Sequence, residues 1–231
     1  MTATSAVPTH AGPAVVQTSS ARIRVAAGAL AVAAATVAGL LATKPWGYRL
    51  DSSADDFLDY DKLLAVHDAA WAAMLVDGFA YAVVALTVSL GVLHLARSGG
   101  HTAALVGAVL TTAGGILFAM GAGAFATLAW FATAPGLADS AGRSLVDYAN
   151  DHVGHAIGVD MAGFVTFTLG TLVLAAALIR ARAVPVLAVG GFVVLTLAQF
   201  VMPAGHDVLN YLQIAMMLML VGFAGLVWRR G

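Results

Sequence analysis

The chain has 231 residues, of which 61% are hydrophobic and only 10% are charged, and its mean hydropathy is +0.90. A soluble domain typically carries about 25% charged residues, so this composition excludes a soluble enzyme and a disordered chain. Eleven basic residues against twelve acidic ones also exclude a nucleic-acid binder, which needs a basic excess. Every acidic residue is Asp and there is no Cys, which removes disulfides, thiolate metal sites and any motif that requires Glu.

The N-terminal region divides into a polar tail and a first apolar segment. Residues 1–22 are rich in Ser, Thr, Pro and Ala and predict a flexible cytoplasmic tail. The apolar run 25–42 follows Arg22 and Arg24, an order also found in signal peptides. The run is longer than a usual signal-peptide core and ends in Leu40-Leu41-Ala42, a poor cleavage site, so a retained helix is favoured.

The rest of the chain, residues 23–231, is expected to form one transmembrane domain. A membrane-crossing helix needs about 20 apolar residues, and six stretches meet that requirement. They predict an all-α, polytopic bundle with six spans, at about 25–42, 71–96, 102–133, 153–179, 183–202 and 208–228. Pro135 and Pro203 follow the third and fifth spans as helix stops, and Pro185 lies in the first turn of the fifth.

The basic residues predict the orientation of the spans, because cytoplasmic loops are enriched in Lys and Arg. With the N-terminus inside, seven Arg residues fall on the cytoplasmic side: Arg22, Arg24, Arg97, Arg180, Arg182, Arg229 and Arg230. The opposite side holds four basic residues over longer loops: Lys44, Arg49, Lys62 and Arg143. We therefore expect a multi-pass protein of the inner cell membrane with both termini in the cytoplasm.

Glycine spacing in the third span predicts close helix packing. Glycines recur there every seven residues, at Gly100, Gly107, Gly114 and Gly121. A sevenfold repeat keeps small residues on one seam of a left-handed bundle. Gly154 and Gly158 form a second small-residue pair at the start of the fourth span. Such faces pack against other helices of the same chain, or bind a second copy of the chain or another membrane protein. The remaining apolar surface is expected to contact the lipid bilayer.

The second and fourth spans also share a register at an offset of 83 residues. Asp77 and Arg97 then align with Asp160 and Arg180. A parallel internal repeat would explain the match, and so would chance in a chain so rich in Ala, Val, Leu and Gly.

Asp77 and Asp160 are the carboxyls expected at membrane depth, where ionisable side chains are costly and usually face the bundle interior. Tyr81 follows Asp77 by four residues and shares its helix face. One interpretation is a protonatable pair coupled to transport or catalysis. The other is a pair of hydrogen-bonded carboxyls that fixes the helix register.

Histidines gather at the expected outer ends of the second, fourth and sixth spans. With the neighbouring carboxylates, the candidate metal ligands are His67, His152, His155, His206, Asp151 and Asp207. Imidazole and carboxylate suit Zn, Cu, Fe or Mn, but the same residues also serve as helix caps and interfacial polar groups. A di-haem site would need a second pair of histidines near the inner face. His94 lies there without a second intramembrane histidine to pair with, so a di-haem site is disfavoured. No cofactor is required by the sequence.

The sixth span carries a polar stripe, because His206, Asn210 and Gln213 follow one another at helical spacing. Methionines also crowd the last two spans, and their uneven spacing favours packing over copper binding.

The junction Leu178-Ile-Arg-Ala-Arg-Ala-Val-Pro185, the Gly-rich third span and the Ala-rich first span resemble uncharacterised six-helix integral membrane proteins of high-GC bacteria. The resemblance implies fold and topology and brings no activity. Our first hypothesis is a non-catalytic accessory or partner-binding membrane component. The alternatives are a membrane enzyme or redox protein that uses the outer His/Asp residues, and a proton-coupled carrier that uses Asp77 and Asp160.

Overall fold

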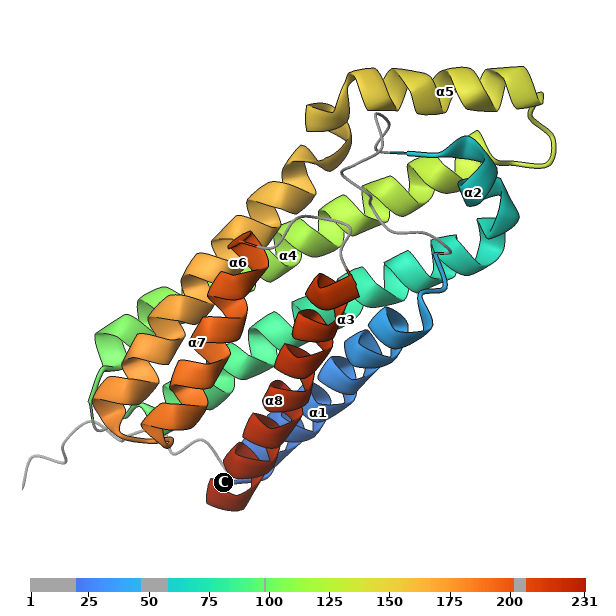
Figure 1. Ribbon diagram of the computed structural model, residues 1–231. Helices are drawn as coiled ribbons and strands as arrows, with labels where there is room; N and C mark the ends of the chain where they lie inside the picture. Colours follow the sequence, from blue (N-terminus) through green and yellow to red (C-terminus); the bar gives the residue numbers. More distant parts are fainter. Residues whose placement is uncertain (1–19, 47–57, 98, 202–206) are drawn as a thin grey trace, which may run out of the picture.

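The computed structural model describes residues 20–46, 58–97, 99–201 and 207–231, and every regular element in these ranges is a helix (Figure 1). The all-α expectation is therefore confirmed. Six longer helices form the bundle: α1 (Ser20–Thr43), α3 (His67–Leu95), α4 (His101–Ala132), α6 (Val153–Ala181), α7 (Val186–Val201) and α8 (Asp207–Arg230). Two shorter ones, α2 (Tyr60–Ala65) and α5 (Asp139–Asp151), lie at one end of the bundle.

Five of these helices, α1, α3, α4, α6 and α8, are long and apolar enough to cross a membrane. The stretch predicted as the fifth span is shorter in the structure, because α7 has 16 residues. At 1.5 Å per residue it measures about 24 Å, against about 30 Å for a bilayer core. It begins one residue after Pro185, and residues 202–206, which include Pro203, lie outside the described ranges.

Left-handed backbone positions mark three of the helix ends. Lys44 after α1 has φ 49°, Arg182 after α6 has φ 50°, and Gly100 before α4 has φ 76°. At Gly100 an added Cβ would also lie 2.9 Å from the carbonyl oxygen of Ala177, so glycine is needed there for space as well as for conformation.

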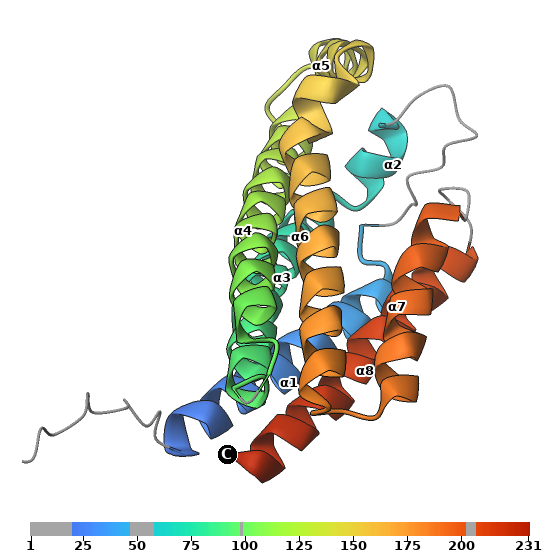
Figure 2. The same cartoon turned by 90° about the vertical axis from the view of Figure 1, so that its left-hand side faces the viewer.

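The long helices pack as a ring in the order α6, α4, α3, α1, α8 and α7, and α7 then returns to α6. The contacts of α4 with α6 and α3 are the most extensive, and those of α7 with its two neighbours are much lighter. Figure 2 shows α3, α4 and α6 side by side, with α7 and α8 set apart from α4. The ring therefore has one tightly packed half and one looser half.

The tight half is built on glycine. On α4, added Cβ atoms at positions 107, 114 and 121 would strike α6 at residues that are also seven apart, Leu174, Phe167 and Asp160. On α6, Gly163 and Gly170 lie against the α4 backbone at Phe118 and Thr111. The close packing predicted from the glycine seam is confirmed, and its partner is α6. Gly154 and Gly158 behave differently, because an added Cβ at either position meets nothing within 4 Å.

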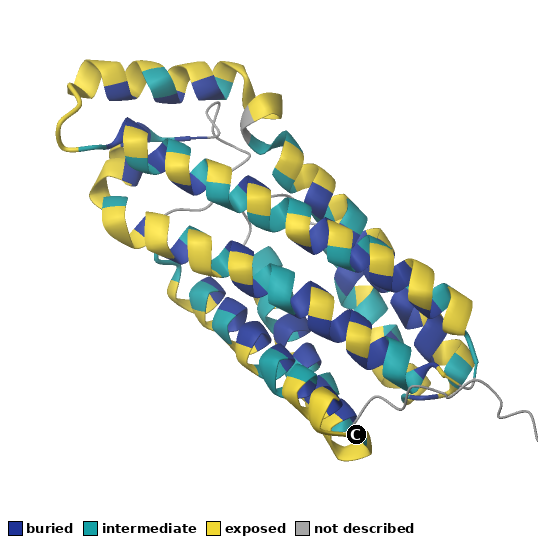
Figure 3. Ribbon diagram, turned by 180° about the vertical axis from the view of Figure 1, so that it is seen from behind, coloured by how far each residue is buried: buried dark blue, intermediate teal, exposed yellow. Residues whose placement is uncertain are grey.

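Large apolar residues are exposed on every long helix, and Figure 3 shows exposed positions alternating with buried ones along the bundle. Leu187 on α7 is 90% exposed, Val25 on α1 73% and Phe79 on α3 71%. Contiguous apolar surface on this scale is untenable in water and is what a lipid-facing surface requires. The structure therefore supports a membrane protein with several transmembrane helices.

Helices α2 and α5, in stretches expected to be loops, form an outer layer over one end of the bundle. Helix α5 lies across the ends of α4 and α6 (Figure 1). It packs Val146 and Ala149 into a small second core with Leu58, Tyr60 and Leu63 from the α2 region. A Cβ at Gly142 would collide with the carbonyl oxygen of Ala132, so glycine lets α5 rest directly on the end of α4.

Candidate functional site

Asp77 and Asp160 lie at the same level on two sides of α4. Asp77 precedes Gly78, whose added Cβ would stand 3.2 Å from Cα of Ala119. Asp160 packs its own backbone against Gly121 of α4, where an added Cβ would approach within 2.6 Å. The close approach of α3 and α6 to α4 thus fixes the height of both carboxyls.

Tyr81 follows Asp77 by four residues on α3 and lies on the same helix face. Tyr81 packs between the bundle helices, with its ring centroid 4.5 Å from that of Phe118 and 6.1 Å from that of Phe167. We call Asp77, Tyr81 and Asp160 the carboxyl site.

Hydrogen bonding at the carboxyl site is incomplete within the described part of the chain. Oδ1 of Asp77 is buried and has no hydrogen-bond partner there. A Tyr81 hydroxyl bonded to this oxygen, which the helical spacing allows, is therefore not formed. A buried carboxyl oxygen without a partner is costly, so this position is poorly explained as a device for fixing register.

His67 is held by its own surroundings. Its Nδ1 lies 2.6 Å from Oγ1 of Thr133, and its ring stacks on Trp130 at a centroid distance of 5.4 Å. Thr133 Oγ1 donates its proton to the carbonyl oxygen of Ala129 at 2.8 Å. The hydroxyl must therefore accept from His67, which places the imidazole proton on Nδ1.

The other predicted metal ligands lie at the junction of α5 and α6. His152 stacks on Tyr148 at 4.1 Å and its Nδ1 is 2.9 Å from the Tyr148 carbonyl oxygen, while the His155 ring is 6.3 Å from that of His152. Asp151 is exposed. No group of three or more His or Asp side chains within the described ranges is placed to hold a metal ion. His206 and the side chain of Asp207 lie outside what the structure describes, so a site that includes them stays a prediction.

The polar stripe of the last span ties helices together. Asn210 Nδ2 donates to the carbonyl oxygen of Leu41 at 2.8 Å, joining α8 to α1. Gln213 Nε2 lies 3.4 Å from Oε1 of Gln199, and Gln199 Nε2 is 2.8 Å from the Met216 sulfur, which joins α8 to α7. Gln199 was not singled out in the sequence, although a lone amide in an apolar helix is itself a signal for such a bond.

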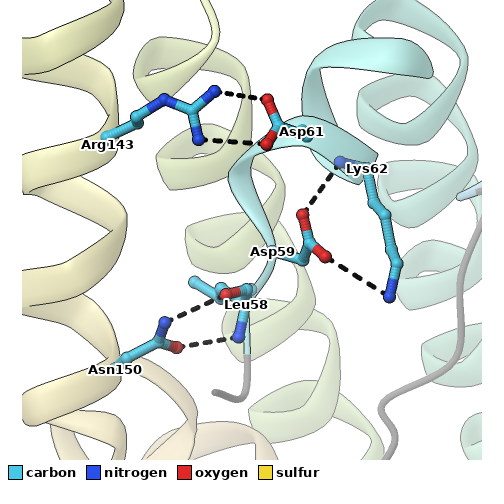
Figure 4. A network of polar contacts seen from close by, with 6 residues as sticks. All are labelled: Leu58, Asp59, Asp61, Lys62, Arg143 and Asn150. Atoms are coloured by element: carbon cyan, nitrogen blue, oxygen red, sulfur yellow. Dashed lines mark hydrogen bonds and ion pairs between the residues drawn. The ribbon is translucent and has the colours of Figure 1, made fainter. Parts of the chain in front are cut away.

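A polar network that the sequence did not reveal holds the outer layer (Figure 4). Arg143 of α5 makes two hydrogen bonds to the Asp61 carboxylate, at 3.0 and 2.5 Å, and these bonds raise the pKa of the guanidinium. The same guanidinium lies over the Tyr60 ring, 4.6 Å from its centroid. Asn150 of α5 accepts from the Leu58 N–H at 2.7 Å and donates to the Leu58 carbonyl at 2.9 Å. These contacts join residues about 80 to 90 positions apart, which spacing along one helix cannot indicate.

Comparisons with protein families, with curated proteins and with solved structures found no match to this chain.

Proposed function

We propose that this chain is a proton-coupled membrane carrier for a small solute, in which Asp77 and Asp160 bind and release the coupling proton. The observation that carries the proposal is the buried, unpartnered Oδ1 of Asp77 beside a second carboxyl. A role in packing alone would favour carboxyls whose oxygens are all hydrogen-bonded.

The burial of Asp77 supports proton binding at this site. An ionised carboxylate away from water is costly, and a bound proton removes that cost. Apart from Arg22, Arg24 and His101 at their first turns, helices α1 and α4 bring no compensating charge, because residues 25–43 and 102–138 contain no titratable side chain.

Proton binding can be measured directly by difference infrared spectroscopy of the reconstituted chain between neutral and acidic pH. We expect a carbonyl band from a protonated carboxyl that disappears in Asp77→Asn and shifts in Asp160→Asn. Asp147→Asn, an exposed carboxyl on α5, is the matched control and should leave this band unchanged. If Asp77→Asn leaves the band unchanged, the carboxyl site does not bind the proton and an accessory, packing role takes precedence.

Transport is tested with the same variants in proteoliposomes. A pH gradient should drive uptake of at least one solute from a panel of amino acids, sugars and monovalent cations. Both Asp77→Asn and Asp160→Asn should abolish that uptake. Uptake that persists in both variants would reject the coupling role.

We also propose that α7 completes a sixth crossing, so that both termini lie in the cytoplasm and the outer layer of α2 and α5 lies on the opposite face of the inner cell membrane. Seven of the eleven basic residues then fall on the cytoplasmic side. A helix of 16 residues spans by local thinning of the bilayer at modest cost.

A further inference from the structure

A cleft of about 400 Å³ lies between α3, α6, α7 and α8, on the looser side of the helix ring. Among the described residues that line it, Thr171 alone carries a side-chain polar group. Its hydroxyl donates to the carbonyl oxygen of Thr168 at 2.8 Å and is therefore already bonded. The volume falls in the range of about 300–1,000 Å³ that small-molecule sites occupy. The walls suit an apolar ligand that needs no hydrogen bonds.

The cleft has the length of one lipid leaflet. Along α6 its lining runs from Phe167 to Leu178, and eleven residues at 1.5 Å each give about 16 Å. Half of a bilayer core is about 15 Å. Pro185, Ala188 and Gly222 line the cleft and are exposed, so it opens on the lipid-facing side of the bundle between α7 and α8.

An α-helix with its side chains is about 10 Å wide, and an acyl chain is much thinner. A single acyl chain is thin enough to enter between α7 and α8. In a bilayer, lipid chains are also the apolar molecules present at the highest concentration around the opening.

One end of the cleft is strongly basic. Val184 and Leu226 line that end. Arg182 lies two residues before Val184 and is exposed, and Arg230 follows Leu226 by one helical turn. Arg230 Nη1 donates to the carbonyl oxygen of Ala183 at 2.5 Å, which holds its guanidinium beside the α6–α7 connection. No acidic residue occurs between Asp160 and Asp207 or after Asp207 in the sequence, so the segments that carry Arg182 and Arg230 bring no acidic side chain to this end of the cleft.

We propose that the cleft binds one acyl chain of an anionic phospholipid whose phosphate lies against Arg182 and Arg230. Basic groups at the end of an intramembrane cleft are the arrangement that recognises anionic headgroups. The inference depends on the chain being embedded in a bilayer and is independent of proton binding by Asp77 and Asp160.

The test uses native mass spectrometry of the full chain in mild detergent, titrated with phosphatidylglycerol or with phosphatidylcholine of identical acyl chains. We expect one phosphatidylglycerol to bind at least ten-fold more tightly than phosphatidylcholine. Gly222→Phe should weaken phosphatidylglycerol binding at least ten-fold, because an added Cβ at Gly222 meets nothing within 4 Å and a larger side chain extends into the cleft. Gly225→Phe is the matched control on the same helix, since Gly225 is also open and does not line the cleft.

Two further variants keep the test decisive. Ala188→Phe fills the cleft from α7 and should reproduce the loss if Gly222→Phe fails to fold. Arg182→Gln should remove the preference for phosphatidylglycerol over phosphatidylcholine while leaving weak binding of both. Equal binding of the two lipids by the wild type, unchanged binding in both Phe variants, or a change of oligomeric state in Gly222→Phe instead of lipid loss would each overturn the proposal.

Discussion

At the scale of single residues, the outer layer depends on a side chain that hydrogen-bonds to backbone groups outside a helix. Asn150 satisfies both the N–H and the carbonyl of Leu58, a residue that precedes α2 and is itself buried. Leaving a buried donor and acceptor unpaired costs about 1–3 kcal/mol. The exposed Arg143–Asp61 pair, by comparison, is worth roughly 0.2–1 kcal/mol.

Asn150→Ala should therefore loosen the outer layer by about 1–3 kcal/mol, measured as faster proteolysis between α1 and α3 and a lower thermal midpoint in detergent. Asp147→Ala, an exposed position on the same helix, is expected to be neutral. A loss in Asp147→Ala equal to that in Asn150→Ala would contradict this account.

The start of α2 should be sensitive to acid. Asp59 caps the helix by accepting the Lys62 N–H at 3.1 Å, and this bond lowers the pKa of the Asp59 carboxyl below its usual 3.8. Because the folded pKa is the lower one, the stabilisation is fully present above about pH 3.8 and is lost as the pH falls through the folded pKa. We expect the protection of the Lys62 amide against hydrogen exchange, measured relative to its intrinsic rate at each pH, to fall in this acid range.

Asp59→Asn is the control for this pH dependence, since Asn caps a helix without titrating. Its protection at Lys62 should stay constant where that of the wild type falls. Parallel acid profiles for the two proteins would show that Asp59 does not carry the effect.

At the scale of elements, the contact between α4 and α6 depends on positions that admit no side chain. An added Cβ at Gly114 would collide with the backbone of Phe167, which has no freedom to move aside. Gly114→Ala should destabilise the bundle by about 1–3 kcal/mol. Gly158→Ala meets open space and should stabilise its helix by up to about 1 kcal/mol. Thermal unfolding of both variants in one detergent distinguishes them, and equal midpoints would contradict the packing seen here.

The elements also show how far a sequence can predict this fold. The sevenfold spacing identified the glycine face of α4, because small residues that recur every seven positions stay on one side of a helix in a packed pair. The same reasoning fails at Gly154 and Gly158, since spacing does not say whether a neighbour is there. Helix α5 was missed because it has only 13 residues and is polar on average, so a search for apolar runs of membrane-span length passes over it, although its buried residues Gly142, Val146 and Ala149 recur at helical spacing.

The candidate sites also differ in how far the sequence alone could predict them. Asp77 and Asp160 were found because a carboxyl inside an apolar span is rare and points inward. The metal site predicted from the histidines is not tested as a whole, because His206 and the Asp207 side chain lie outside the described residues. His67 and His152 each have their own partners, Thr133 and the Tyr148 carbonyl.

At the scale of the whole molecule, the number of crossings decides the relative position of the two ends. The natural absence of cysteine allows single-cysteine variants without background labelling. With six crossings, Ser20→Cys and Arg229→Cys should react with an impermeant maleimide only after the cells are permeabilised. Ser140→Cys on α5 should react in intact cells. Labelling of Arg229→Cys in intact cells would mean that α7 does not cross.

The glycine contacts between α4 and α6 also limit how the molecule can move. Because they repeat every seven residues, a sliding step smaller than about 10 Å would drive side chains into the facing backbone. Helices α4 and α6 therefore behave as a single rigid frame that carries Asp160, with α3 and Asp77 packed against its other side. In the proposed carrier, alternation of access to the carboxyl site is expected from α7, whose contacts with α6 and α8 are light, whereas α8 packs extensively on α1. A cross-link between α7 and α6 should then arrest the proposed transport without disturbing the site itself.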